Sequence, residues 1–491
     1  MSQAQPSLEQ VKILAGNYKT VPIYQTLPAD VKTPVEVFKI LKKLSRQCFI
    51  LESLEDPQQR GRYTFLGYDP KLEITCTNGT LHMKNGAELH IQTDDPGRYI
   101  KQLLEENQSP CLPELPPFSG GLVGYFSYDY IKYSEPTLNL DAEDQEGFKD
   151  VDLMLFDKVV AYDHLQEQIL LIIHIKTDAL TENYHKAVSE LAYLSRLIET
   201  GVPAVMPPLK ILSPFRPLFE KDAFCRMVDK AKAYIREGDI FQVVLSNRLE
   251  ADIEGSLFDT YRILRSVNPS PYMFYFSSDD VEIAGASPET LVKVLDGKVY
   301  TFPLAGTRPR GNTAAEDIAL EKELLADPKE LAEHHMLVDL GRNDIGKISE
   351  FSSVTVEKYL SIERFSHVMH IGSTVQGTMQ KDKTALDAID ALLPAGTLSG
   401  APKIRACEII NELENNKRGI YGGAIGYIAF SGNMDACIAI RIAFKKNNKV
   451  FIRSGAGIVA DSVPENEFAE CGNKMQAVLK ALKLAEGGGQ E

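Results

Sequence analysis

The sequence predicts an α+β fold whose sheets are large and mostly antiparallel, and two observations support that class. In the C-terminal half, strand-like runs such as VEIAGASP and YGGAIGYIAF are separated by short turns rather than by one helix each. Segments with helical periodicity flank these runs instead of alternating with them. Because successive parallel strands need a crossover, usually a helix, this order favours antiparallel pairing.

Length and composition limit the classes of protein to consider. A chain of 491 residues is too long for a single core, and about 150 residues per domain predicts two or three domains. Its 44% hydrophobic and 25% charged residues are typical of a soluble globular protein. A net charge of -15 disfavours nucleic-acid and anionic membrane partners, because these are bound through an excess of Lys and Arg.

The cysteines and the first residues bear on the compartment. Seven cysteines, scattered and never spaced as C-x-x-C, predict reduced thiols and no zinc site. The start lacks the basic and apolar regions of a signal peptide, and no run approaches ~18 apolar residues. We therefore expect a cytoplasmic protein without a membrane partner.

The region from 10 to 200 is predicted to be a mixed α and β domain. Its apolar runs, among them YTFLGY and QILLIIHI, alternate with turn signals and helical segments. Its acidic stretch at 141–152 is predicted to be an exposed loop. Five prolines between 203 and 217 exclude a helix or a central strand. We place the domain boundary there, with a second domain at 220–485.

Arg441 is the one charged residue of ACIAIRIAF (436–444), a run predicted to form a single strand. A buried unpaired guanidinium is costly, so it needs an anion, and a carboxylate can bind it in bidentate fashion. An internal ion pair is the alternative. Gly455 and Gly457, in IRSGAGIV, would let backbone N–H groups approach a carboxylate without a Cβ in the way.

Two stretches imitate nucleotide-binding motifs, and both are rejected. GAGIVA (455–460) follows a predicted strand, but the helix that should receive a pyrophosphate is delayed to Pro464. GRNDIGK (341–347) has Ile348 where a P-loop needs Ser or Thr, and a helix precedes it.

Acidic residues cluster on a helix predicted to begin at Pro464. Glu467, Glu470 and Lys474 share one face, because residues three and four apart are neighbours on a helix. Apolar residues line the opposite face. Taken alone, this pattern also fits a solvated polar face.

A second acidic helix is predicted to be capped by Asp327 and to begin at Pro328. Glu330 and Glu333 lie three residues apart, in line with an apolar stripe, and are predicted to point inward.

Two inward carboxylate pairs would repel each other unless a hard dication lay between them. Magnesium prefers oxygen ligands, usually one or two carboxylates together with waters and substrate oxygens. We therefore interpret Glu333 and Glu470 as direct magnesium ligands, and Glu330 and Glu467 as outer residues that hold its waters.

Five stretches spanning about residues 220–485 resemble, in order, the motifs of chorismate-utilising enzymes. They are KELAEHHMLVDLGRND, SHVMHIGS, LPAGTLSGAPKIRA, YGGAIGY and SVPENEFAECGNK. The N-terminal part resembles the first domain of anthranilate synthase component I. The resemblance implies large antiparallel sheets packed as a β-sandwich, flanked by helices and formed by two intertwined domains, one regulatory (10–200) and one catalytic and chorismate-binding (220–485).

The resemblance also implies the contents of the site. One magnesium ion would bridge the ring carboxylate of chorismate to the four glutamates, and Lys474 would balance their charge. Tyr421 and Arg441 would hold the enolpyruvyl carboxylate. The other substrate-binding residues implied are Gly306, Thr307, Thr397, Gly455, Ala456 and Gly457.

Two positions discriminate between reactions within this family. Gln242 stands where members that add water have a lysine base, and glutamine cannot deprotonate water. Ala305 stands where members that make aminodeoxychorismate carry a lysine that can act covalently, and a methyl group cannot be a nucleophile. Ammonia addition followed by aromatisation remains, which is the anthranilate synthase reaction.

Two acid–base roles follow from the resemblance. Glu289, in GASPET, would be the general acid that helps the ring hydroxyl leave. His370 by its residue context alone is either a core histidine or an acid–base group. The resemblance assigns it to the later loss of pyruvate.

A feedback site for L-tryptophan is implied by two further stretches, FILESLED and NPSPYMFYF. Its residues would be Glu52, Ser53, Pro271, Tyr272 and Met273. The alternative is a strand end that packs against a proline-fixed turn.

The chain is expected to need a partner. No segment resembles a glutamine amidotransferase with its cysteine nucleophile, so a separate amidotransferase subunit would supply ammonia in a hetero-oligomer, expected as a heterotetramer. The competing interpretations are aminodeoxychorismate synthase component I and a non-catalytic tryptophan-binding regulator.

Overall fold

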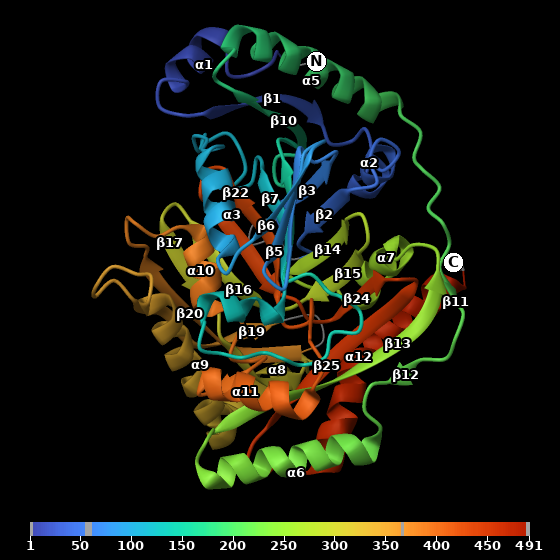
Figure 1. The fold of residues 1–491 in the computed structure, drawn as a ribbon, viewed down its shortest axis with the longest axis vertical. Coiled ribbons are helices and arrows are strands. Elements are labelled where there is room, and N and C mark those ends of the chain that lie inside the picture. Colours follow the sequence, from blue (N-terminus) through green and yellow to red (C-terminus); the bar gives the residue numbers. More distant parts are fainter. Residues whose placement is uncertain (1–2, 55–60, 365–367, 488–491) are drawn as a thin grey trace.

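Two large antiparallel sheets form the centre of the molecule in the computed structural model, which describes residues 3–54, 61–364 and 368–487 (Figure 1). The first sheet consists, in spatial order, of β1 (Thr20–Pro28), β10 (Gln168–Lys176), β9 (Lys158–Asp163), β3 (Tyr63–Tyr68), β2 (Cys48–Glu52), β14 (Tyr272–Ser277), β15 (Glu282–Ser287), β24 (Ile442–Lys446), β25 (Lys449–Ile458), β13 (Gln242–Glu254) and β11 (Lys210–Ile211), with β12 (Arg216–Pro217) and β21 (Gly400–Ala401) beside β13.

The second sheet consists, in spatial order, of β18 (Leu304–Pro309), β20 (Val368–Thr378), β17 (Lys298–Thr301), β16 (Thr290–Leu295), β23 (Met434–Ile438), β22 (Ala424–Ala429), β7 (Gly121–Phe126), β8 (Val151–Phe156), β4 (Leu72–Thr77), β5 (Thr80–Lys84) and β6 (Glu88–Gln92), with β19 (Thr355–Arg364) beside β20. The two sheets share a core of interdigitating aromatic side chains, for example Phe49 and Phe274 from the first and Tyr125 from the second. This is the sandwich that was predicted.

Each sheet takes strands from both halves of the chain. In the first sheet the halves join where β2 pairs with β14, and in the second where β22 pairs with β7. The predicted intertwining is therefore confirmed. The proline-rich segment runs down one side of the molecule between α5 (Leu180–Thr200) and α6 (Lys221–Glu237), where it contributes only the two-residue strands β11 and β12 (Figure 1).

Helices cover the outer faces of both sheets. Against the first sheet pack α1 (Leu8–Leu14), α2 (Pro34–Leu41), α5, α7 (Phe258–Val267) and α12 (Pro464–Glu486). Against the second pack α3 (Pro96–Glu105), α9 (Pro328–Gly346) and α10 (Ala385–Leu392). The remaining helical elements are η1 (Tyr128–Tyr130), α4 (Ile131–Ser134), α6, α8 (Ala314–Ala326) and α11 (Lys403–Glu414).

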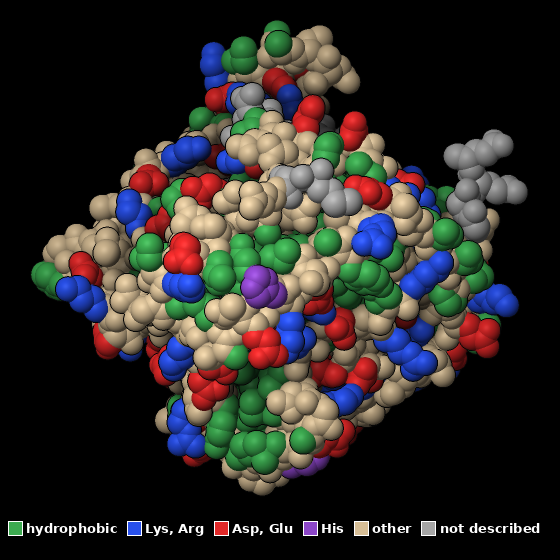
Figure 2. Space-filling model, turned by 90° about the horizontal axis from the view of Figure 1, so that it is seen from above, with side chains coloured by type: hydrophobic (Ala, Val, Ile, Leu, Met, Phe, Trp, Pro, Cys, Tyr) green, Lys and Arg blue, Asp and Glu red, His purple; other side chains and the backbone are tan. Residues whose placement is uncertain are grey.

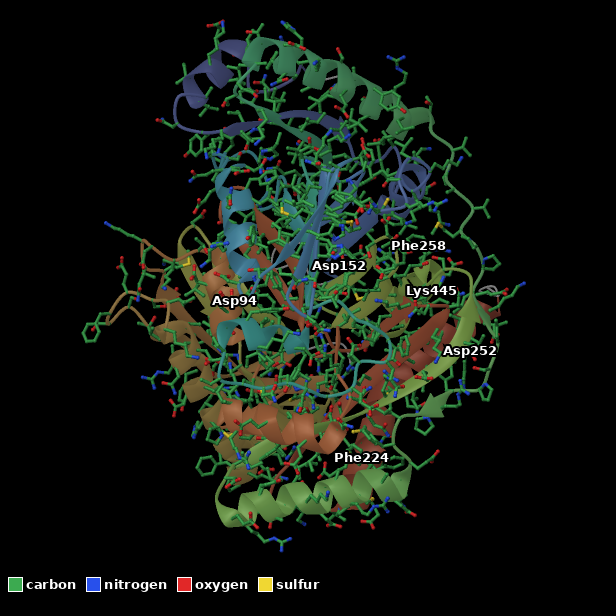
Figure 3. The ribbon with its side chains drawn as sticks, in the orientation of Figure 1. Asp94, Asp152, Phe224, Asp252, Phe258 and Lys445 are labelled. Atoms are coloured by element: carbon green, nitrogen blue, oxygen red, sulfur yellow. The ribbon has the colours of Figure 1, made fainter. Side chains whose placement is uncertain are left out.

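The acidic stretch at 141–152 is only partly the exposed loop that was predicted. Its last residues enter β8, and Asp150 and Asp152 are buried. Asp152 lies in the interior, where Lys149 and Ser278 bind its carboxylate at 3.1 and 3.0 Å (Figure 3). The charge pattern misled here because Lys149 compensates the buried carboxylate of Asp152, and Lys132 that of Asp150.

The run ACIAIRIAF is also not the single strand that was predicted. It forms β23 of the second sheet and β24 of the first, and Arg441 lies at the crossing with φ of 53°. The run is apolar on both sides of Arg441 because each strand is buried in its own sheet.

On the face seen in Figure 2, acidic and basic side chains are interspersed. All seven cysteines are free thiols. Within the described residues, no helix has the length and apolar character to cross a membrane.

Candidate active site

Helix α12 carries its acidic face as predicted. The helix begins at Pro464, and Cys471 and Met475 are buried on its other side. Lys474 Nζ forms an ion pair with Glu470 at 2.7 Å and donates to the carbonyl oxygen of Gly455 at 3.0 Å. The lysine therefore connects the carboxylates of α12 to the glycine-containing end of β25.

Helix α9 begins with the predicted cap. Asp327 accepts hydrogen bonds from the backbone N–H groups of Lys329 and Glu330 at 3.0 and 3.4 Å. Glu330 is half-buried and lies against Gly306, where a Cβ would be 3.1 Å from its Oε2. Glu333 is exposed, so the inward orientation predicted for the pair holds for Glu330 alone.

The carboxylates of α9 and α12 act on one another. Partial desolvation of its carboxyl group raises the pKa of Glu333, although the residue as a whole is exposed. The negative charges of Glu330 and Glu470 raise this pKa further. Desolvation likewise raises the pKa of Glu467, to which the charge of Glu470 contributes. The two helices thus concentrate negative charge in one region, as the sequence predicted.

These glutamates suit a hard dication by their chemistry. All donors are carboxylate oxygens, and a bound cation would relieve their mutual repulsion. Among the described residues, no three His, Cys, Asp or Glu side chains converge into a metal-binding group. Magnesium needs only one or two carboxylates, because waters and substrate oxygens complete its shell. The donor set therefore fits magnesium.

His370 lies beside two predicted substrate-binding residues. Its Nδ1 is 2.8 Å from the carbonyl oxygen of Gly306 and 3.1 Å from Thr307 Oγ1. Because a carbonyl only accepts, this geometry assigns the proton to Nδ1. Burial lowers the pKa of His370, so the imidazole is neutral near pH 7.

Glu289 is held between β15 and β16, where it faces Thr397. Thr397 Oγ1 donates to Glu289 Oε1 at 3.0 Å. Burial raises the pKa of Glu289 to about 7, an effect opposed by the hydrogen bond from Thr397 and by the charge of Lys474. A carboxyl with this pKa can donate a proton at neutral pH.

Arg441 places a largely desolvated guanidinium group in the candidate site. Its side chain is largely desolvated, which lowers its pKa. Across the residues that the structure describes, no hydrogen bond or ion pair reaches this guanidinium, so the internal ion pair considered as an alternative is not formed. Its charge acts on His370, which places the two side chains in one site. Holding a buried cation unpaired is costly, and an anionic ligand would compensate it.

The glycines of β25 make room for polar groups. A Cβ on Gly455 would lie 3.0 Å from the hydroxyl of Tyr421, and a Cβ on Gly457 would lie 2.5 Å from Gln242 Nε2. Between them Ala456 is buried, because strand residues alternate in direction. Tyr421 and Gln242 thus lie over the backbone at the end of β25.

The two stretches predicted to bind L-tryptophan lie next to each other. Met273 of β14 is opposite Glu52 of β2, and the carboxylate of Glu52 is bound by Arg265 at 2.5 Å and by Tyr261. The last two residues of FILESLED, Glu55 and Asp56, lie outside the described residues.

Beside this stretch, Ser53 follows Glu52 at the end of β2 and Pro271 precedes β14. The hydroxyl of Tyr272 is 2.7 Å from Asp435, so it contacts the second sheet.

Two residues near the site were not identified from the sequence. Arg308 of β18 contacts Asp327 at 3.0 Å and Glu330 at 3.4 Å. Asp344 of α9 lines the same small cavity as Glu289. Asp344 falls in the stretch that imitates a P-loop, and no periodic signal distinguishes either residue from an ordinary surface charge.

Comparisons with known proteins agree with this geometry. A family model described as chorismate binding enzyme matches residues 46–480. Anthranilate synthase component 1 of Acetivibrio thermocellus is 47% identical, over 98% of this chain and 99% of its own. The corresponding protein of Acinetobacter calcoaceticus is 45% identical, over 98% of both chains.

Solved structures resemble the fold as well. The crystal structure of anthranilate synthase component I from Streptococcus pneumoniae TIGR4 matches with a TM-score of 0.74 and 41% identity, over 85% of this chain and 92% of that chain. The menaquinone-specific isochorismate synthase of Escherichia coli matches with a TM-score of 0.71 at 18% identity, over 97% of this chain and 98% of that chain, a likeness of fold alone.

Proposed function

We propose that this chain, which belongs to the chorismate-binding enzymes and among them to anthranilate synthase component 1, converts chorismate and ammonia to anthranilate and pyruvate in the first step of tryptophan synthesis. The observation that carries the proposal is the unpaired, desolvated guanidinium of Arg441 on a segment whose backbone is hydrogen-bonded to that of a carboxyl of pKa about 7, Glu289, through Ile438 N–H at 3.0 Å. An anionic substrate that needs a proton donor fits both groups.

The glutamates of α9 and α12 supply the magnesium site in this proposal. Glu333 and Glu470 would hold the ion directly, and Glu330 and Glu467 would hold its waters. When bound, magnesium supplies positive charge for the ring carboxylate of chorismate. Lys474, which pairs with Glu470, limits the net negative charge before the ion binds.

Side chains of the protein bind the enolpyruvyl carboxylate of chorismate and assist the departure of both leaving groups. Arg441 binds the enolpyruvyl carboxylate, with the hydroxyl of Tyr421 and the backbone at Gly455 and Gly457 beside it. Glu289 protonates the ring hydroxyl, so that it departs as water. Neutral His370 then assists the loss of pyruvate in the aromatising step.

The identity of the nucleophile is supported by two uncharged side chains. Gln242 lies over Gly457 and cannot act as the base that water would need. Ala305 of β18 is buried and offers no nucleophile for the aminodeoxychorismate route. Ammonia, which carries its own lone pair, needs neither.

Ammonium salts are expected to sustain anthranilate formation by this chain alone, whereas glutamine will do so only after a glutamine amidotransferase subunit is added. The reason is that the proposed site contains no cysteine nucleophile to release ammonia. The measurement is anthranilate fluorescence from chorismate with magnesium and either nitrogen source. Chromatography of the product against the ortho and para aminobenzoates excludes the aminodeoxychorismate alternative. Glutamine-dependent turnover by the purified chain would contradict the proposal of a separate partner.

Regulation by L-tryptophan is proposed for the junction of β2 and β14, because the first-domain strand meets the second domain there. An effector bound at this junction acts by favouring an arrangement in which chorismate fits poorly.

Replacing Ser53 by Ala is therefore expected to raise the tryptophan concentration for half-inhibition by about tenfold, within the coupling of about 1 to 3 kcal/mol typical of such sites. Uninhibited turnover should change little. Calorimetry with L-tryptophan measures the binding directly, and Ser189→Ala on the exposed face of α5 is the matched control. Inhibition unchanged by the Ser53 substitution would remove the regulatory assignment, and binding without any turnover would favour the non-catalytic regulator.

A further inference from the structure

A cavity of about 50 Å³ lies beside Glu289, between the second sheet and α9. Its lining includes Thr301 at the end of β17, Gly341 and Asp344 of α9, and Thr397. A water molecule needs about 10 to 15 Å³, so the cavity has room for at least one. Polar groups line it at both the Glu289 and the Asp344 positions, as a stably bound water requires.

Glu289 and Asp344 are the two ionisable residues among the described lining residues. One oxygen of Glu289 accepts from Thr397 Oγ1 at 3.0 Å, and within the described residues the other makes no hydrogen bond. A protonated carboxyl at this position therefore has its O–H available to a substrate or to a water in the cavity.

Asp344 connects the cavity to a second helix and to solvent. Its Oδ2 accepts from Lys403 Nζ at 2.9 Å, and Lys403 also donates to the carbonyl oxygen of Leu392. The other oxygen of Asp344 lies 3.5 Å from Lys347 Nζ, whose side chain is 53% exposed. Asp344 and Lys403 are both largely buried. The charged groups that face Asp344 are thus Lys403 from α11 and Lys347 beyond α9.

We propose that water in this cavity links the carboxyl group of Glu289 to the Asp344–Lys403 ion pair and returns a proton to Glu289 in each turnover. The inference rests on the proposed function, because it requires Glu289 to be the general acid. In this arrangement Asp344 is a positioning residue that orients the water, and Lys347 connects the pair with solvent.

The proton balance of the step is complete. The O–H bond of Glu289 breaks as its proton moves to the ring hydroxyl, and the C–O bond breaks with its electron pair leaving on the oxygen as water. Ammonia forms the C–N bond and releases its extra proton to solvent. The carboxylate left on Glu289 takes a proton from the cavity water, which regains one from solvent beside the ion pair.

Two variants interrupt the link in different ways. Gly341→Ala adds a methyl group on the cavity side of α9, 3.0 Å from Thr301 Cγ2 and 3.5 Å from Pro303 Cγ, without altering any charge. Alanine also favours the helix more than glycine does. Asp344→Asn keeps the shape of the side chain and removes the negative charge that orients the water and pairs with Lys403. Gly346→Ala, in the same helix, is the matched control, because a Cβ there meets no atom within 4 Å.

With saturating ammonium and chorismate, Gly341→Ala and Asp344→Asn are each expected to lower kcat by about tenfold, a part of what general acid catalysis contributes. The solvent deuterium isotope effect on kcat should increase and the KM for chorismate should stay unchanged. Gly346→Ala should match the wild type in all three measurements. A purely structural role for the cavity would not change the isotope effect.

The outcomes separate this proposal from the proposed function. A wild-type chain that makes no anthranilate would refute the proposed function itself, and Glu289→Gln with normal kcat would refute the acid role. If Glu289→Gln is impaired while Gly341→Ala keeps the wild-type kcat and isotope effect, the water link is wrong. Circular dichroism identifies misfolding of Asp344→Asn, and in that case Gly341→Ala decides the question.

Discussion

Glu470→Gln is expected to lower kcat/KM for chorismate by about 100-fold or more while leaving the fold intact, because the proposed magnesium ion would lose one of its direct carboxylate ligands. The substitution also removes the negative partner of Lys474, so an uncompensated ammonium group would lie at the place where the cation should bind. Both effects would weaken the binding of the metal and, through it, the binding of the substrate's ring carboxylate.

The measurement has a readout besides turnover. Titration calorimetry with magnesium should show weakened binding for Glu470→Gln, and circular dichroism should show an unchanged spectrum. Glu465→Gln is the matched control, since Glu465 is exposed in the first turn of the same helix and outside the proposed ligand set. Normal ammonium-dependent turnover by Glu470→Gln would show that the metal assignment is wrong.

The second large effect concerns the general acid. Glu289→Gln is expected to reduce kcat by about 10² to 10⁴, the range that general acid catalysis contributes. Glutamine keeps the size of the side chain, and its amide oxygen can still accept the hydrogen bond from Thr397. The decrease in kcat therefore reports the missing acidic proton rather than a missing contact.

The raised pKa of Glu289 predicts how kcat depends on pH if Glu289 is the general acid. Burial raises the pKa to about 7, so the protonated acid prevails below pH 7 and is lost as the pH rises through that value. At a constant concentration of free ammonia, wild-type kcat should therefore decrease above about pH 7. Glu289→Gln should lack this decrease.

Thr397→Val tests the direction in which the pH dependence of kcat shifts. The hydrogen bond from Thr397 lowers the pKa of Glu289, so its removal should move the decrease in kcat to higher pH. A profile that stays in place, or that moves to lower pH, would contradict Glu289 as the titrating acid.

Local chemistry was sufficient to predict the two helices that carry the glutamates. Asp327 with Pro328, and Pro464 alone, mark helix starts because a capping side chain and a ring without an N–H suit only the first positions of a helix. The three-residue spacing then places Glu467 and Glu470 on one face. The prediction was weaker for Glu333, since an apolar stripe indicates the mean direction of a face and not the exposure of each residue at its edge.

The sequence by itself determined the α+β class and the helix starts, because each of these depends on residues close together in the chain, and its motifs supplied the proposal for the donors and acids of the site. The tertiary structure decided which distant groups meet. Arg441 lies between strands of two different sheets, and Asp344 shares a cavity with Glu289. Both placements follow from the order of strands in the two sheets and from the packing of α9 on the second sheet. Hydrophobic periodicity does not determine strand order or helix packing, since many strand orders bury the same alternating faces equally well.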